Sequence, residues 1–93
     1  MSEEERKKMD EQIQSRVRMW NTVQEAENRI KNKIEMIEQY RAQMEVTDEV
    51  KTQDEKCRLQ YEQFQTISGN ALEHNKTLLE QLATTKDIIL RNT

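Results

Sequence analysis

Cys57 and His74 are the side chains in this 93-residue sequence whose types suit nucleophilic or metal chemistry. Cys57 lies between Lys56 and Arg58, and neighbouring cations can lower the pKa of a thiol and make it reactive. A metal site requires several converging ligands, but the chain has one cysteine, one histidine and one glycine. This composition excludes an internal disulfide, a cluster of His and Cys ligands and a glycine-rich phosphate loop. We therefore expect Cys57 to pack as a small side chain on a helix and His74 to be solvated.

Charged side chains are abundant, with 18 acidic residues against 15 Lys and Arg, for a net charge of −3. Carboxylates act as general acids or bases when a pocket desolvates them, and a rod of helices offers no such pocket. The basic clusters at 6–8 and 29–33 are bracketed by acids, and the sequence pI is about 5.2. A surface that follows nucleic-acid phosphates requires the opposite balance. We expect no enzymatic activity, no metal or cofactor and no nucleic-acid partner.

The elements that position these side chains must be helices, because the chain contains no proline and a single glycine. Hydrophobic residues make up 33% of the sequence and aromatic residues 4%, which is thin for the core of a single globule. Long amphipathic helices instead share an apolar stripe with a partner helix. The sequence therefore predicts an all-α protein, a single region over 1–93 that forms a coiled coil or a helical bundle.

Residues 10–44 carry the clearest helical pattern. Their apolar or large side chains recur every three or four residues, which keeps them on one side of an α-helix. The spacing approaches the roughly 3.5-residue repeat of a coiled-coil seam, and acid-then-base pairs such as Glu27 and Lys31 are placed to support an exposed helix. The pattern predicts a helix over about 4–44. Its stripe comprises Ile13, Val17, Trp20, Val23, Ala26, Ile30, Ile34, Ile37, Tyr40 and Met44.

The stretch 45–56 interrupts this stripe, because its acids outnumber its bases and its valines lie off the preceding phase. Two structures are compatible with it: a continuous helix with a slip in phase, or a chain reversal that makes a hairpin. The absence of Gly, Pro and Asn favours the continuous helix. Against this, Thr52 and Glu55 match a capping box that would begin a second helix.

A second stripe then follows a strict alternation of three- and four-residue steps and predicts a helix over about 54–91. Ser68, Asn75 and Thr85 occupy positions where Leu or Ile would pack best, and such polar residues fix the register at a cost in stability. The segment 68–70 contains the only glycine, which costs about 1 kcal/mol in a helix relative to alanine, so a continuous helix with a weak joint and a break with a true turn are both open there. The stripe comprises Cys57, Tyr61, Phe64, Ser68, Ala71, Asn75, Leu78, Leu82, Thr85 and Ile89.

Residues 68–80, with the sequence Ser-Gly-Asn-Ala-Leu-Glu-His-Asn-Lys-Thr-Leu-Leu-Glu, resemble the conserved helix of KxDL-motif proteins. The resemblance implies a small helical subunit of a complex that positions lysosome-related organelles. The defining Lys-x-Asp-Leu is absent, and its nearest match is Lys86-Asp87-Ile88. The resemblance therefore concerns the class of helical subunit and does not extend to membership of the family.

These patterns predict a non-enzymatic interaction subunit that assembles with other α-helical chains into a larger complex, for example a cytoskeletal, kinetochore-type or organelle-positioning assembly. The polar seam residues favour a different partner chain over a second copy. The alternative is a regulatory or inhibitory helical module that docks on an enzyme or a motor. The sequence lacks an apolar signal-peptide region and a membrane-spanning stretch, so we expect a cytoplasmic or nuclear protein that is neither secreted nor inserted in a membrane. The predicted partner interface comprises Ile13, Val17, Trp20, Val23, Ile30, Ile34, Ile37, Met44, Tyr61, Phe64, Leu78, Leu82 and Ile89.

Overall fold

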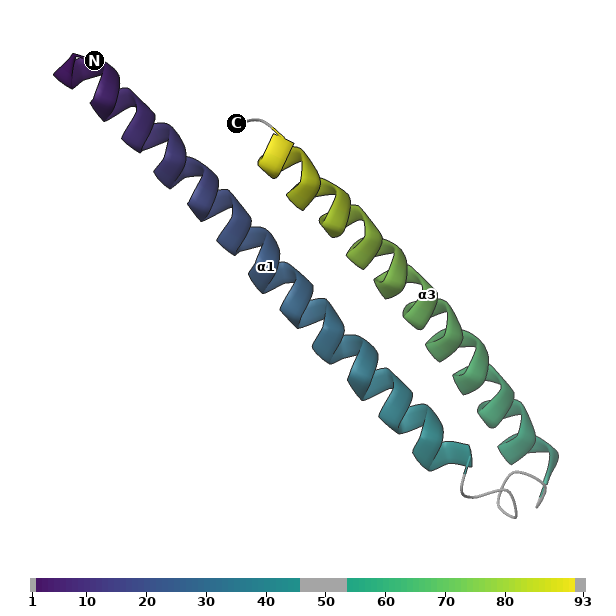
Figure 1. Cartoon of the computed structure of the whole chain (residues 1–93). Coiled ribbons are helices and arrows are strands. Elements are labelled where there is room, and N and C mark those ends of the chain that lie inside the picture. The colour runs from purple at the N-terminus through teal and green to yellow at the C-terminus, as the bar shows by residue number, and fades with distance from the viewer. Residues whose placement is uncertain (1, 46–53, 92–93) are drawn as a thin grey trace.

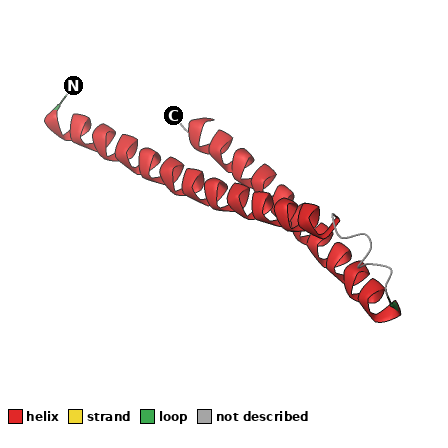
Figure 2. Cartoon of the chain, turned by 90° about the horizontal axis from the view of Figure 1, so that it is seen from below, coloured by secondary structure: helices red, strands yellow, loops and turns green. Residues whose placement is uncertain are grey.

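The computed structural model describes residues 2–45 and 54–91, which form two long α-helices (Figure 1). Helix α1 covers Glu3–Glu45 and helix α3 covers Glu55–Arg91. The helices run antiparallel and cross at a shallow angle (Figure 2), and the molecule measures 77 × 15 × 14 Å. The described residues contain no strand. The predicted all-α class with long helices is therefore confirmed.

Helix α1 begins at a serine cap. The backbone N–H of Glu5 donates to Ser2 Oγ at 3.2 Å, and the N–H of Arg6 donates to the Ser2 carbonyl at 3.1 Å. A hydroxyl in this position satisfies a backbone donor that the first helical turn leaves unpaired. The acidic side chains of the first turn also favour the positive end of the helix dipole. These local interactions explain why the helix starts one residue before the predicted boundary.

The end of α1 at Glu45 agrees with its composition. Its last turn carries no basic residue, so nothing there compensates the negative end of the helix dipole. The sequence that follows is rich in valine and threonine, whose β-branched side chains lower helix propensity. Residues 46–53 themselves, including the predicted cap Thr52, lie outside the described residues.

Because α1 and α3 run antiparallel, the protein has the hairpin form of the two alternatives that the sequence left open for 45–56 (Figure 1). The lack of Gly and Pro in this stretch favoured a continuous helix, but that argument applies to tight turns. Helix–helix connections commonly use about 2–8 residues, and a link of that length needs no special turn residue. Eight residues stand between Glu45 and Asp54 in the sequence, so the lack of Gly and Pro is no argument against a chain reversal.

Asp54 is the residue that caps α3. Its Oδ1 accepts a hydrogen bond from the Cys57 N–H at 2.7 Å, and its carbonyl accepts one from the Arg58 N–H at 3.2 Å. The helix therefore starts at Glu55, whereas Thr52, the first residue of the predicted capping box, lies outside the described residues. The carboxylate of Asp54 is a strong acceptor for this cap, because it is charged and lies at the positive end of the helix dipole.

Helix α3 passes through 68–70 without interruption, so of the two alternatives for this segment the structure has the continuous helix and not the turn. Gly69 has an ordinary helical backbone with no positive φ. A Cβ built on Gly69 would lie 3.4 Å from Nη1 of Arg41 in α1, and Ser68 beside it is buried. Contacts from the opposite helix therefore hold the glycine segment in helical conformation and offset its poor propensity.

No apolar side chain of the described residues is buried, and the two buried residues are Glu27 and Ser68, each 8% exposed. Two helices can cover only one side of each other, so the apolar seam between them stays half-exposed along both edges. The hairpin thus has an interface between its helices but no enclosed hydrophobic core.

Candidate functional site

The two helices meet along a seam whose members alternate in steps of three and four residues, the a and d positions of a heptad repeat. Each seam residue is buried or half-buried over the central part of the hairpin. In α3 these are the residues of the predicted stripe, with the exception of Thr85, which is exposed. In α1 they are Arg16, Trp20, Val23, Glu27, Ile30, Ile34, Ile37 and Arg41.

Three charged residues therefore occupy seam positions of α1 for which the spacing of apolar side chains predicted uncharged neighbours. Arg16 takes the position predicted for Val17, and Glu27 takes the position predicted for Ala26. Arg41 takes the position predicted for Tyr40, which is 55% exposed. The prediction failed here because it followed apolar side chains and stepped over charged ones. The strict three–four alternation of α3, carried over to α1, would have placed all three charged residues in the seam.

Lys86 of α3 neutralises Glu27. Its ammonium lies 2.6 Å from Glu27 Oε1, and the two side chains are 16% and 11% exposed. The same ammonium donates a hydrogen bond to Oε1 of Gln24 and lies 4.4 Å from the centroid of the Trp20 ring. Glu27 Oε1 is buried, and among the described residues its polar contact is the ion pair with the Lys86 ammonium. A largely desolvated carboxylate is tolerated because one lysine supplies its counter-charge from the other helix.

The i,i+4 spacing of Glu27 and Lys31 predicted an ion pair on the helix surface, but the described residues have none between these two side chains, and Glu27 contacts Lys86 instead. Lys86 stands 62 positions along the chain from Gln24, its other partner in α1. Local spacing could not reveal this cluster, since its members meet only after the chain reverses. We name Trp20, Gln24, Glu27 and Lys86 the lysine cluster.

Arg41 forms a second polar contact nearer the closed end of the hairpin. Its Nη1 donates to the Gln65 carbonyl at 2.8 Å and to Ser68 Oγ at 2.6 Å. The Ser68 hydroxyl in turn donates to the Phe64 carbonyl at 2.6 Å. The predicted role of Ser68, a polar seam residue that fixes register, has a geometric basis in this network. Asn75, the other internal polar residue of the seam, donates to the Ala71 carbonyl of its own helix at 2.7 Å.

The structure places most of the predicted partner-interface residues within the hairpin, where the second helix half-buries them. This group consists of Trp20, Val23, Ile30, Ile34, Ile37, Tyr61, Phe64, Leu78, Leu82 and Ile89. Ile13, Val17 and Met44 are exposed, at 49%, 53% and 39%. Most of the predicted stripe thus forms the interface between α1 and α3, and its outer residues remain exposed to solvent.

Two shallow grooves flank the seam near the open end of the hairpin. One, of about 240 Å³, is lined by Val17 and Trp20 of α1 together with Ile89 and Leu90 of α3. The other, of about 390 Å³, is lined by apolar groups that include Met19 and Ile89. Helix α1 extends past the end of α3 here (Figure 1). Both grooves are apolar depressions on a helical surface and carry no convergent catalytic groups.

Cys57 is half-buried at the first turn of α3. Its side-chain hydrogen bond with Asp54, followed by the charge of that carboxylate, raises the pKa of the Cys57 thiol. This direction is opposite to the one that Lys56 and Arg58 would cause, so it does not support activation of the thiol by these cations. The backbone hydrogen bond from Cys57 correspondingly lowers the pKa of Asp54.

His74 is exposed on α3. In the described part of the chain, no three His, Cys, Asp or Glu side chains come together in a way that could hold a metal ion. Nor is either described helix apolar over a length sufficient to cross a bilayer. The geometry that remains is a half-exposed apolar seam with two polar contacts across it.

No protein-family model, no curated protein and no solved structure matches the chain. The resemblance of residues 68–80 to the helix of KxDL-motif proteins therefore rests on the sequence alone.

Proposed function

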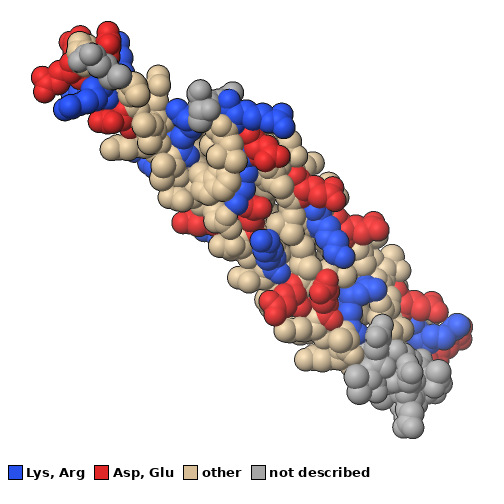
Figure 3. Space-filling view, viewed as in Figure 1, with Lys and Arg blue, Asp and Glu red and all other residues tan. Residues whose placement is uncertain are grey.

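We propose that this protein is a non-enzymatic helical-hairpin subunit that assembles with other α-helical chains into a larger complex. The observation that carries the proposal is the absence of any buried apolar side chain among the described residues. Large apolar side chains are instead exposed on both helices, from Met44 at 39% to Ile67 at 69%. Figure 3 shows uncharged side chains at the surface between scattered acidic and basic ones. Association with further helices would remove these groups from water.

The energetic argument follows from the half-exposed seam. Full burial of a large apolar side chain is worth about 1.5–3 kcal/mol, and a two-helix hairpin collects only part of this for each seam residue. Helices in proteins gain most of their stability from packing of their apolar face. A third or fourth helix laid along the seam would complete the burial of residues such as Ile30, Ile34 and Ile37. The protein therefore gains stability from assembly in the manner of a bundle subunit.

The test is the native size of the protein and its dependence on the seam. In gel filtration with light scattering on native extract, we expect the chain in an assembly larger than a single 11.2 kDa hairpin. Ile34→Asp, which places a charge in the seam, should release the chain from that assembly, whereas the exposed-site control Glu38→Lys should leave it in place. A monomeric, fully helical and concentration-independent wild-type chain would contradict the proposal. A monomer that becomes helical only when an enzyme or motor target is added would favour the regulatory module instead.

A further inference from the structure

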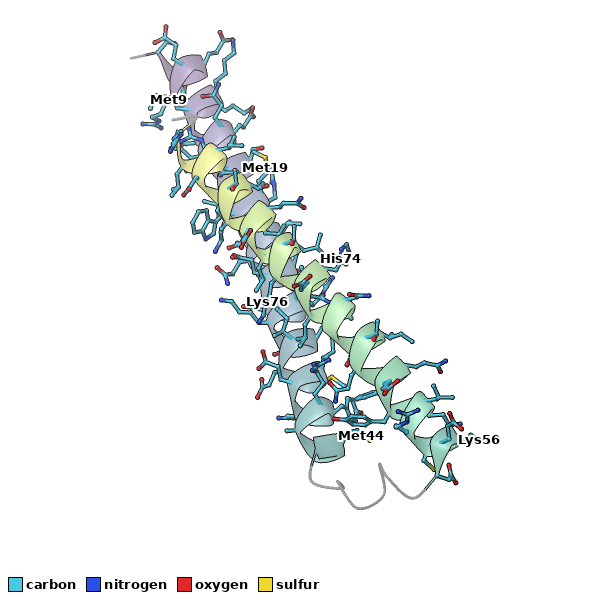
Figure 4. The ribbon with its side chains drawn as sticks, turned by 90° about the vertical axis from the view of Figure 1, so that its right-hand side faces the viewer. Met9, Met19, Met44, Lys56, His74 and Lys76 are labelled. Atoms are coloured by element: carbon cyan, nitrogen blue, oxygen red, sulfur yellow. The ribbon has the colours of Figure 1, made fainter. Side chains whose placement is uncertain are left out.

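The contacts of the lysine cluster define two different sides of the hairpin. In heptad notation Gln24 and Lys86 both occupy e positions, which directly follow a d position, and they are hydrogen-bonded to each other. The e positions of α1 and α3 therefore share one side of the hairpin. The g positions, which precede the a positions, must then share the opposite side together with the neighbouring c positions. Figure 4 shows two such residues, Met19 and His74, on the same side of the hairpin.

This second side has no acidic residue over most of its length, and we name it the acid-free face. It consists of the c and g positions between 12 and 43 in α1 and between 60 and 91 in α3. Its charged groups are bases, notably Arg29 and Lys33, with His74 opposite. This distribution is unexpected for a chain whose net charge is −3. The acids of the same two ranges occupy other heptad positions: Glu25, Glu27, Glu35, Glu38, Glu62, Glu73, Glu80 and Asp87.

Apolar pairs lie at both ends of the acid-free face. Tyr40 and Ile67 directly precede Arg41 and Ser68, which contact each other across the hairpin, and they are 55% and 69% exposed. Met19 and Ile88 directly precede two residues that line one groove, and they are 47% and 52% exposed. The pairs are 21 positions apart in each helix, from 19 to 40 and from 67 to 88, or roughly 32 Å. The bases lie between them.

Three hydroxyl groups of this face, those of Thr22, Thr77 and Thr84, are already hydrogen-bonded within their own helices. Thr22 donates to the Arg18 carbonyl at 2.9 Å, and Thr84 donates to the Glu80 carbonyl at 3.1 Å. Thr77 makes the same contact four residues back in its own helix, at 3.0 Å. A partner that covers these three threonines leaves none of their hydroxyl donors unpaired, which removes a common cost of burying polar side chains.

We propose that the acid-free face is the docking surface for an acidic amphipathic helix of a different protein. Such a helix would place carboxylates opposite Arg29, Lys33 and His74, and large apolar side chains opposite the Met19–Ile88 and Tyr40–Ile67 pairs. It must span roughly 32 Å, which requires about 21 residues. The proposal deepens the assembly function and rests on it, because it assigns the surface and the chemistry of the partner.

A second copy of this chain fits the face less well. In a two-fold dimer, the Met19–Ile88 pair of one copy would lie against the Tyr40–Ile67 pair of the other. The symmetry axis would then pass between positions 26 and 33, and Arg29 and Lys33 of one copy would lie close to the same residues of the other. Like charges opposed in an interface repel each other and disfavour association. Nucleic acid is also disfavoured, because a phosphate-binding surface would carry more bases and fewer exposed apolar side chains.

The experiment combines charge reversal with zero-length cross-linking of the full chain in its native assembly. Arg29→Glu with Lys33→Glu should lower the affinity for the assembly at least about tenfold, which corresponds to about 1.4 kcal/mol. The matched control Lys31→Glu with Lys76→Glu reverses two exposed bases that lie off the face and should leave the affinity unchanged. A carbodiimide should join Lys33 of the wild-type chain to Asp or Glu of another protein. Circular dichroism of each variant reports whether the helices are intact.

The remaining outcomes overturn the proposal in distinguishable ways. An assembly that survives the Arg29 and Lys33 reversal refutes the acid-free face while preserving the assembly function. A wild-type chain that is monomeric in extract refutes both. Cross-links from Lys33 that lead only to another copy of this chain identify a homo-oligomer. Release of the chain by nuclease identifies nucleic acid as the ligand of Arg29 and Lys33.

Discussion

Lys86 and Glu27, from opposite helices, form an ion pair at 2.6 Å in which both side chains are nearly buried. The pair lies beside Trp20, and the Lys86 ammonium is 4.4 Å from the centroid of the Trp20 ring. A pair of this kind tolerates only the antiparallel register that brings both charges together, since a shift along the seam would leave a carboxylate in an apolar contact. The pair therefore specifies alignment of the two helices more than it adds to their stability.

Removal of either partner of this ion pair is expected to destabilise the hairpin. Lys86→Leu leaves Glu27 without a counter-charge, and Glu27→Leu leaves Lys86 without one. Each substitution should lower the free energy of unfolding by about 1–3 kcal/mol. The double variant replaces both charges by apolar groups and should lose less than the sum of the single losses. Urea unfolding followed by circular dichroism measures all three free energies. Strict additivity would show that the two side chains do not interact.

Gly69→Ala is expected to stabilise the protein by up to about 1 kcal/mol, the difference in helix propensity between the two residues. The added Cβ would lie 3.4 Å from Arg41 Nη1, which is an ordinary van der Waals distance, so Arg41 can keep its hydrogen bonds to Gln65 and Ser68. The midpoint of thermal unfolding provides the measurement. Gly69→Leu serves as the comparison, because its longer side chain would displace the guanidinium. A lower midpoint for the alanine variant would show that Arg41 needs the space.

Acidification is expected to weaken the start of α3 through its cap, Asp54. The pKa of this carboxyl is lowered from 3.8, chiefly by its hydrogen bond with the Cys57 backbone. A lowered folded-state pKa means that the contribution is complete above the ordinary value and is lost as the pH falls through the lower one. Asp54→Asn retains a capping acceptor that does not titrate, so it should remove this component of the acid transition. The carboxyl chemical shift of Asp54 followed against pH would contradict the prediction if its midpoint lay at or above 3.8.

Cys57 is expected to react slowly with iodoacetamide at neutral pH, because only the thiolate attacks and Asp54 raises the pKa of this thiol. The folded chain should be alkylated more slowly than the same chain in denaturant. Asp54→Asn removes the negative charge and should speed the reaction of the folded chain. The pH dependence of the alkylation rate measures the thiol pKa directly. A folded chain that reacts faster than the denatured one would mean that Lys56 and Arg58 dominate the environment of Cys57.

The sequence by itself determined the helices and most of their facing sides. The spacing of apolar residues is a local property, so it predicted α1 and α3 to within a residue or so at each boundary and placed the α3 seam from Cys57 to Ile89. It did not identify Arg16, Glu27 and Arg41 as seam residues, because the spacing of apolar side chains does not register charged ones. A charged residue becomes acceptable in a seam when a partner lies opposite, and that partner is remote in sequence.

The tertiary structure alone decided which residues face each other. The reversal brought Lys86 to Glu27 and Arg41 to Ser68, and the register then gathered the c and g positions of both helices on one side. Charges that look evenly mixed along the chain separate into an acid-free face and an acidic remainder once the two helices are aligned. The physical reason is that hydrogen bonds and ion pairs act over a few ångströms in space, whereas a linear pattern records only neighbours along a single helix.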